Sequence, residues 1–192
     1  MSSTLNSPLY EVFDNVLTPE FCQKVIYRFD LDQRSQPGIV GAQGIKLDVK
    51  QSLDLRISDF EDWKEYDDVF FQTLLKYLPS FYSNDFFKDN GSHYDQGFQI
   101  QKTKTDQIGY TWHDDFHMEM CNGRLSYRYI TYIFYMNDVQ EGGETEFWEG
   151  TKIKPKTGRL LLFSSDWHHV HRGLPPISNT KYIVTGWTYR HL

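Results

Sequence analysis

From Gln96 to its C terminus, the chain is built of short segments rich in aromatic and β-branched residues, with turn signals between them. Such residues favour strands, because their side chains suit a pleated, half-buried surface. The segments are GFQIQKT, YTWHDDF, RYITYIFYMN, ETEFWE, TKIKP, GRLLLFSS, HHVHRG and YIVTGWTYR. Short strands at this regular spacing predict a β-sandwich or a jelly-roll barrel. We therefore expect an α+β fold that is mainly β, with its jelly-roll core at about residues 96–190.

The N-terminal half is expected to be helical. Residues 18–29 carry apolar side chains at helical spacing, and Thr18 can cap a helix that starts there. Residues 61–78 repeat the pattern, and Pro79 is expected to end this second helix. Both helices fall within about the first 95 residues, where we expect them to support one face of the barrel. A single domain spanning residues 1–192 is the resulting prediction.

Composition argues against several classes of protein. The net charge is −6 and no half of the chain is strongly basic, so a nucleic-acid partner is not expected. The two cysteines, Cys22 and Cys121, form no CxxC pattern, which argues against a disulfide framework and a zinc ribbon. MSSTLNSPLYEVFDN has no apolar signal core, and no run of eighteen apolar residues occurs. We therefore expect no membrane association and a cytoplasmic location.

The segment GYTWHDDFHME crowds metal-ligating side chains together. On a helix, His113 and His117 would lie one turn apart and resemble the zinc-protease pattern HExxH. That pattern needs Glu directly after the first His, whereas this chain has Asp114, and GYTW favours a strand. On a strand, His113 and Asp115 share one face and can chelate one ion. We favour the strand, with His117 and Glu119 exposed or behind the ligands.

A third ligand is expected from the segment DWHHVHRG. Both His169 and His171 qualify, and the spacing to Lys181 and Asp166 favours His171. Two imidazoles and one carboxylate leave three positions of an octahedral ion open, as in non-haem Fe(II) oxygenases. Lys181 is expected to point into the same barrel. There it would pair with one end of a dicarboxylate whose other end chelates the iron.

Four motifs in this order resemble the prolyl-4-hydroxylase-type 2-oxoglutarate- and Fe(II)-dependent dioxygenases. They are GYTWHDDF, YITYIFYMNDVQEGGETEFW, KPKTGRLLLFSSDWHHVHRGLPP and KYIVTGWTY. The resemblance covers about residues 98–189. It implies a double-stranded β-helix, which is a distorted jelly roll, with supporting N-terminal helices.

The resemblance also implies roles for individual residues. The iron ligands of the family are matched by His113, Asp115 and His171. Its residues near 2-oxoglutarate are matched by Lys181, Tyr135, Thr185 and Tyr110. Where some members have a tyrosine that contacts 2-oxoglutarate, this chain has Thr103.

The implied activity is hydroxylation of a C–H bond with Fe(II), 2-oxoglutarate and O2, and ascorbate is a candidate reductant. The resemblance is nearest to enzymes that act on prolyl residues in peptides, so a peptide or protein substrate is predicted. The glycine-rich residues 36–50 are predicted to form a mobile loop that closes over this substrate. Trp112 and Trp148 are predicted to stack on it at the barrel mouth.

Other functions fit the same residues. One is an oxygenase of the same fold that acts on a free amino acid, a small molecule or an alkylated base. Another is a sensor that binds metal and 2-oxoglutarate without turnover, and production of succinate separates an enzyme from such a sensor. A jelly roll with accidental histidines is disfavoured, because His113, Asp115, His171 and Lys181 occur together.

Overall fold

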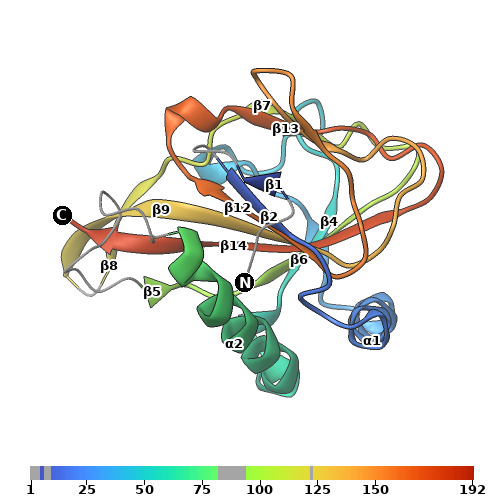
Figure 1. Cartoon of the computed structure of the whole chain (residues 1–192), viewed down its shortest axis with the longest axis horizontal. Helices are drawn as coiled ribbons and strands as arrows, with labels where there is room; N and C mark the ends of the chain where they lie inside the picture. Colours follow the sequence, from blue (N-terminus) through green and yellow to red (C-terminus); the bar gives the residue numbers. More distant parts are fainter. Residues whose placement is uncertain (1–4, 7–9, 82–93, 122) are drawn as a thin grey trace.

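The structure is a computed structural model that describes residues 5–6, 10–81, 94–121 and 123–192 (Figure 1). Its strands form two antiparallel sheets. In chain order they are β1 (Leu5–Asn6), β2 (Tyr10–Phe13), β3 (Gln36–Pro37), β4 (Leu53–Arg56), β5 (Tyr94–Asp95), β6 (Gln99–Thr103), β7 (Tyr110–His113), β8 (Met118–Cys121), β9 (Arg124–Tyr135), β10 (Thr145–Phe147), β11 (Lys152–Ile153), β12 (Arg159–Ser164), β13 (His171–Gly173) and β14 (Lys181–His191). The larger sheet has the order β1-β2-β12-β9-β14-β6-β4-β3, with β5 paired to β14 and β8 to β9. The smaller sheet has the order β11-β10-β13-β7.

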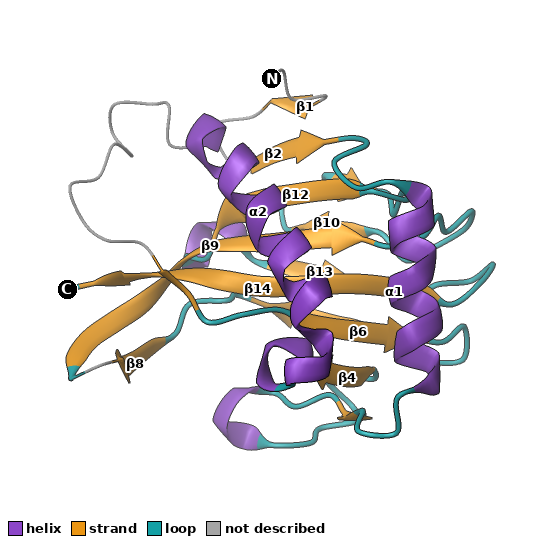
Figure 2. Cartoon of the chain, turned by 90° about the horizontal axis from the view of Figure 1, so that it is seen from below, coloured by secondary structure: helices purple, strands orange, loops and turns teal. Residues whose placement is uncertain are grey.

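Two helices cover the outer face of the larger sheet (Figure 2). Helix α1 (Pro19–Leu31) begins where predicted, because the Thr18 hydroxyl accepts a hydrogen bond of 3.2 Å from the amide of Phe21. Helix α2 (Lys64–Phe81) follows two 3-10 turns and runs two residues past Pro79, which was expected to end it. Proline lacks an amide hydrogen and crowds the preceding turn, so the helix ends close to it, two residues later than expected. Among the described residues, no helix combines the length and the apolar character needed to cross a membrane.

The long strand β9 faces two separate cores. Successive strand residues point to opposite faces, so its apolar run can be buried on both sides. Toward the helices, Ile130, Tyr132 and Phe134 join the core that includes α1 and α2. Toward the smaller sheet, Ile133 and Tyr135 join a second core. The two facing antiparallel sheets confirm the predicted jelly roll.

The expectation of purely helical support within the first 95 residues is wrong in one respect. Strand β2 extends the larger sheet beyond β12, and β4 extends it beyond β6. LDLR alternates between apolar and charged residues, whereas YEVF ends in two buried apolar residues. Each segment has four residues, the shortest length over which alternation indicates a strand. The strand β4 matters for function, because Lys50 and Ser52, which directly precede it, line the cavity described next.

Candidate active site

Two histidines meet on the smaller sheet, where β7 pairs with β13. His113 is the last residue of β7, His171 is the first of β13, and the two are direct partners in the pairing. Their ring centroids lie 4.3 Å apart. The pairing shifts register between His171 and Gly173, so that the β7 residues from Tyr110 to His113 oppose a shorter stretch of β13. Such a bulge re-aims side chains, and both Tyr110 and His113 line the same cavity.

Asp115 completes the cluster from a loop and not from a strand. We expected His113 and Asp115 to share one strand face, but β7 ends at His113. The Asp114 carboxylate accepts a hydrogen bond of 3.0 Å from the Phe116 amide, which turns the chain at this point. The Asp115 carboxylate accepts a hydrogen bond of 2.8 Å from the Thr131 hydroxyl of β9. This partner fixes the carboxylate beneath the two imidazoles.

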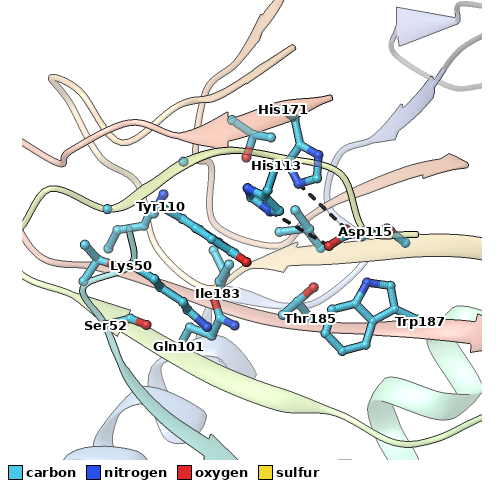
Figure 3. Close-up of a pocket in the computed structure, with 17 residues that line it drawn as sticks. Lys50, Ser52, Gln101, Tyr110, His113, Asp115, His171, Ile183, Thr185 and Trp187 are labelled. Atoms are coloured by element: carbon cyan, nitrogen blue, oxygen red, sulfur yellow. Dashed lines mark hydrogen bonds and ion pairs between the residues drawn. The ribbon is translucent and has the colours of Figure 1, made fainter. Parts of the chain in front are cut away.

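The three side chains present their ligand atoms to one point (Figure 3). Asp115 lies 3.9 Å from Nε2 of His113 and 3.8 Å from Nε2 of His171. All three ligand atoms lie within 4.8 Å of one another. Nδ1 of His113 is 2.7 Å from the Thr111 carbonyl, and Nδ1 of His171 is 2.9 Å from the His169 carbonyl. Because each Nδ1–H donates to a carbonyl, each Nε2 lone pair is left for a metal.

Electrostatics keeps His113 and Asp115 in their metal-binding forms at neutral pH. Burial, together with the nearby His171, lowers the pKa of His113 to about 3, so this imidazole is neutral. Burial raises the pKa of Asp115, but His171, His113 and the Thr131 hydroxyl lower it further, and it lies below its usual value. Two imidazoles and one carboxylate on one side of an ion suit a six-coordinate Fe(II) with open positions. The residues present therefore fit the iron that the sequence predicts.

His169, the alternative third ligand, is not part of the cluster of ligand atoms. It belongs to a 3-10 turn (Trp167–His169), and its Nδ1 is 2.9 Å from the Asp166 carboxylate. The zinc-protease alternative also fails, because His113 ends a strand and no helix joins it to His117.

A buried cation without an acidic partner lies in the same cavity. The Lys181 side chain is 5% exposed, and its ammonium donates a hydrogen bond of 3.0 Å to the Gly143 carbonyl. Among the described residues, no carboxylate lies within ion-pair distance of Lys181. A buried charge normally has a partner of opposite sign. The site is therefore built to receive an anion opposite the metal ligands.

Comparisons with known proteins agree with this geometry. Residues 98–189 match the family model of the 2OG-Fe(II) oxygenase superfamily. The matched stretch contains all three candidate iron ligands and Lys181. Prolyl 4-hydroxylase 1 of Arabidopsis thaliana is 26% identical over 205 residues, which span 94% of this chain and 69% of that protein. The probable prolyl 4-hydroxylase 10 of the same plant is 31% identical over 124 residues, which span 50% of this chain and 43% of that protein.

Solved structures show the same fold. The viral collagen prolyl hydroxylase of Paramecium Bursaria Chlorella virus-1, in complex with 2OG, has a TM-score of 0.69 at 24% identity, covering 96% of this chain and 97% of that one. A Trichoplax adhaerens prolyl hydroxylase in complex with a hypoxia inducible factor peptide has a TM-score of 0.77 at 19% identity, covering 96% and 85%. The predicted enzyme class, a prolyl-4-hydroxylase-like 2-oxoglutarate-dependent dioxygenase, is confirmed. Enzymes of this superfamily use Fe(II), 2-oxoglutarate and O2.

Not all of the residues that were predicted to bind 2-oxoglutarate line the cavity of this oxygenase. Lys181 and Thr185 line the cavity, and Thr103 is the direct strand partner of Lys181. Tyr135 does not line it in this structure, because its hydroxyl donates to the Thr145 hydroxyl at 2.7 Å. Thr145 lines the cavity in its place. No sequence pattern pointed to Thr145, because it lies on β10 and only the fold brings it to Tyr135 of β9.

We expect 2-oxoglutarate binding by this oxygenase to weaken above about pH 8. Burial lowers the pKa of Lys181 from 10.5 to about 8, and the charge of Glu144 offsets part of this effect. A bound carboxylate needs the protonated amine, so affinity should fall by about tenfold per pH unit above that value. Conversely, the free energy of unfolding of the ligand-free protein should rise between pH 8 and 10.5. In that pH range the Lys181 amine is protonated in the unfolded chain and deprotonated in the folded chain, so raising the pH favours the folded state.

Calorimetric titration of the Mn(II)-loaded oxygenase with 2-oxoglutarate, at a series of pH values across this range, measures the effect. The pH dependence above 8 should vanish in Lys181→Met, whose residual binding no longer depends on that proton. A wild-type affinity that stays constant up to pH 9.5 would show that Lys181 does not pair with the cosubstrate.

Trp112 and Trp148 do not line the metal cavity, and their stacking on a substrate stays a prediction. Trp148 follows the buried Phe147 of β10 and is 71% exposed. It contacts Trp112 with ring centroids 5.3 Å apart, and the Arg172 guanidinium lies 4.4 Å from the Trp112 ring. Both tryptophans therefore face away from the metal ligands. Trp187, at the far end of β14, lines the cavity instead.

Proposed function

We propose that this oxygenase hydroxylates a prolyl residue within a peptide or protein. The observation that carries the proposal is a second cleft that continues from the metal cavity, since Thr185 and Trp187 line both. The other walls of the cleft include Gln99, Glu119 and Arg128. A polypeptide needs such an extended path on either side of the reacting residue. A free amino acid would instead need a closed pocket with partners for both of its charges.

The donors around the cavity suit a peptide bond that precedes proline. Such a bond has a carbonyl acceptor and no N–H group, so it requires only donors from the enzyme. Nε1 of Trp187 is buried and has no partner among the described residues. Burial, and after it the negative charge of Asp115, raises the pKa of Tyr110 to about 12, so its hydroxyl stays protonated and can donate. The plant prolyl 4-hydroxylases and the peptide-bound Trichoplax adhaerens structure support the same substrate class.

The chain's own residues supply binding and orientation. His113, Asp115 and His171 would hold the iron, and Lys181 would hold the distal carboxylate of 2-oxoglutarate. When bound, iron and cosubstrate together supply the oxidising chemistry. The buried walls exclude water from the reacting C–H bond.

Arg128 supports the site and does not line the metal cavity. Its guanidinium lies 3.5 Å from the centroid of the Trp187 ring and donates a hydrogen bond of 3.1 Å to the Tyr189 hydroxyl. Ascorbate as reductant and a cytoplasmic location stay predictions from the sequence.

Mass spectrometry of proline-containing peptides, incubated with the enzyme, Fe(II), 2-oxoglutarate and O2, tests the proposal. We expect one oxygen to be added at proline, with matching production of succinate. The same peptides with alanine in place of proline are the control and should gain none. Oxidation of free amino acids or methylated nucleobases, with no change in any prolyl peptide, would favour the alternative oxygenases. Binding of 2-oxoglutarate without succinate, whatever the substrate offered, would favour the sensor.

Deletion of residues 39–44 should weaken peptide binding selectively. The loop ends at Lys50, which lines the cavity, and the deleted part exposes Ile39, while Ile45 and Leu47 follow it with large exposed fractions. Exposed aliphatic side chains on a glycine-rich loop can bury themselves against a bound chain. We expect the peptide KM to rise by about tenfold, which corresponds to roughly 1.4 kcal/mol. The 2-oxoglutarate affinity should stay nearly unchanged, and an equal loss of both would show that the deletion disturbs the cavity itself.

A further inference from the structure

A second buried lysine lines the metal cavity and has no part in the mechanism above. Lys50 is 4% exposed and lies at the end of the 36–50 loop. Its ammonium lies 2.7 Å from the Asp54 carboxylate. Asp54 also accepts hydrogen bonds of 2.7 Å from the Ser52 hydroxyl and 2.9 Å from the Gln99 amide. Unlike Lys181, Lys50 is therefore already paired, and it is fixed in place by a carboxylate that is itself held by two further donors.

The fixed ammonium of Lys50 faces the ring of Tyr110. It lies 5.4 Å from the ring centroid, within the range of a cation–π contact. On its other side the Tyr110 ring stacks on His113, with centroids 3.5 Å apart and planes 15° apart. Figure 3 shows the Tyr110 ring between Lys50 and His113. The ring is thus held between a buried ion pair and a metal ligand.

The backbone makes the same connection. Lys50 and Tyr110 form a β-bridge. The Thr111 amide donates to the Val49 carbonyl at 2.9 Å, and the Gln51 amide donates to the Gly109 carbonyl at 2.8 Å. The Thr111 carbonyl is the acceptor for Nδ1 of His113. The end of the loop is consequently joined to the backbone that orients a metal ligand.

The start of the loop meets the same ion pair. The Gly38 amide donates to the Ser52 carbonyl at 2.9 Å. A Cβ at Gly38 would lie 2.8 Å from Cε of Lys50 and 2.9 Å from a carboxylate oxygen of Asp54, and closer still to the Ser52 hydroxyl. Residues at both ends of the loop therefore lie against the Lys50–Asp54 pair. A change in the conformation of the loop would displace this pair.

We propose that Lys50, held by Asp54, is a positioning residue that keeps Tyr110 stacked on His113. In this way it couples the 36–50 loop to the metal centre. The Tyr110 hydroxyl has no hydrogen-bond partner among the described residues and points into the cavity (Figure 3). The position of the Tyr110 ring determines where its hydroxyl lies in the cavity. The stacking contact also restrains the plane of the His113 imidazole. Partners behind metal ligands tune metal affinity in this way. The proposal goes beyond the proposed function and does not depend on which substrate is hydroxylated.

The Co(II)-loaded protein without substrate gives a direct test. Co(II) reports ligand geometry in its visible absorption spectrum, and its dissociation constant can be measured by titration. Lys50→Met keeps the side-chain length and removes the charge. We expect it to change the Co(II) spectrum and to weaken Co(II) binding by about tenfold, the low end of the effect of losing an outer partner. Lys50→Arg, which can keep both the ion pair and the contact with the ring, should restore the wild-type spectrum.

Lys102→Met is a matched control. Lys102 lies 2.6 Å from the Asp30 carboxylate and 5.3 Å from the Tyr182 ring, so it makes the same two contacts on the opposite face of β6. Its loss should leave the Co(II) spectrum and affinity unchanged. Equal spectral changes in Lys50→Met and Lys102→Met would overturn the proposal, because they would reflect a general loss of packing.

Gly38→Ala tests the loop end of the coupling without touching Lys50. Its methyl group must displace the Ser52 hydroxyl or the Lys50 side chain, so it should alter the Co(II) spectrum in the same direction as Lys50→Met. A folded Gly38→Ala or Lys50→Met protein with the wild-type spectrum and affinity would overturn the proposal. If Lys50→Met does not fold, Gly38→Ala decides the question by the same criterion.

Discussion

His171→Ala is expected to abolish turnover and metal binding together. Among the described residues, three side chains form the ligand cluster, and His171 supplies one of its two imidazoles, with Nε2 at 3.8 Å from the Asp115 carboxylate. Its loss leaves one imidazole and one carboxylate, too few to hold Fe(II) against competing ligands. The affinity should therefore fall by more than the roughly 10- to 100-fold that loss of an outer partner costs. Titration with Co(II) measures binding, and succinate production measures turnover.

The neighbouring His169→Ala variant is the control. His169 is also buried, but its Nδ1 is 2.9 Å from Asp166, outside the cluster of ligands. Its backbone carbonyl, which accepts from Nδ1 of His171, is unaffected by the substitution. We expect this variant to keep Co(II) binding and most of its turnover. If it lost metal while His171→Ala kept it, the ligand assignment would be wrong.

The sequence predicts the chemistry of the site better than its geometry. His113 with Asp115 and His171 with Lys181 form two short sequence patterns, and the fold brings the four residues to one cavity. The direction of a side chain, however, depends on strand pairing and on bulges that no local pattern encodes. The register shift between β7 and β13 is such a case. Simple alternation would put Tyr110 with Trp112 and away from His113, whereas Tyr110 stacks on His113 and Trp112 faces away.

Long-range contacts explain what the sequence did not reveal. Thr131 of β9 donates a hydrogen bond to Asp115, and Thr145 of β10 accepts one from Tyr135, which was predicted to bind 2-oxoglutarate. A single threonine in a sequence does not indicate such a role. The Lys50–Asp54 pair joins the last residue of the predicted 36–50 loop to strand β4, a four-residue strand that was not predicted. Each of these contacts exists only once the two sheets face each other.

Lys181→Met should separate ligand binding from stability. In the ligand-free protein, burial lowers the pKa of Lys181 to about 8, so keeping it charged at neutral pH costs about 3 kcal/mol. Methionine removes that cost and keeps the length of the side chain, so the ligand-free variant should be as stable as the wild type or more stable. Most buried substitutions destabilise. A gain in melting temperature at this position would mark a residue retained for binding.

The same substitution should nearly abolish 2-oxoglutarate binding. It leaves a buried carboxylate without its cation, at a cost of about 3–5 kcal/mol, which corresponds to a loss of roughly a hundredfold or more in affinity. Thr185→Val and Thr145→Val each remove a hydroxyl and should cost less, about 1 kcal/mol each. Lys152→Met, at a half-exposed lysine near Glu146, is the control and should change neither quantity. Thermal unfolding of the Mn(II)-loaded proteins with and without 2-oxoglutarate measures both effects at once. The wild type should gain stability from the cosubstrate and Lys181→Met should not, and an equal gain in both proteins would rule out Lys181 as the partner of the distal carboxylate.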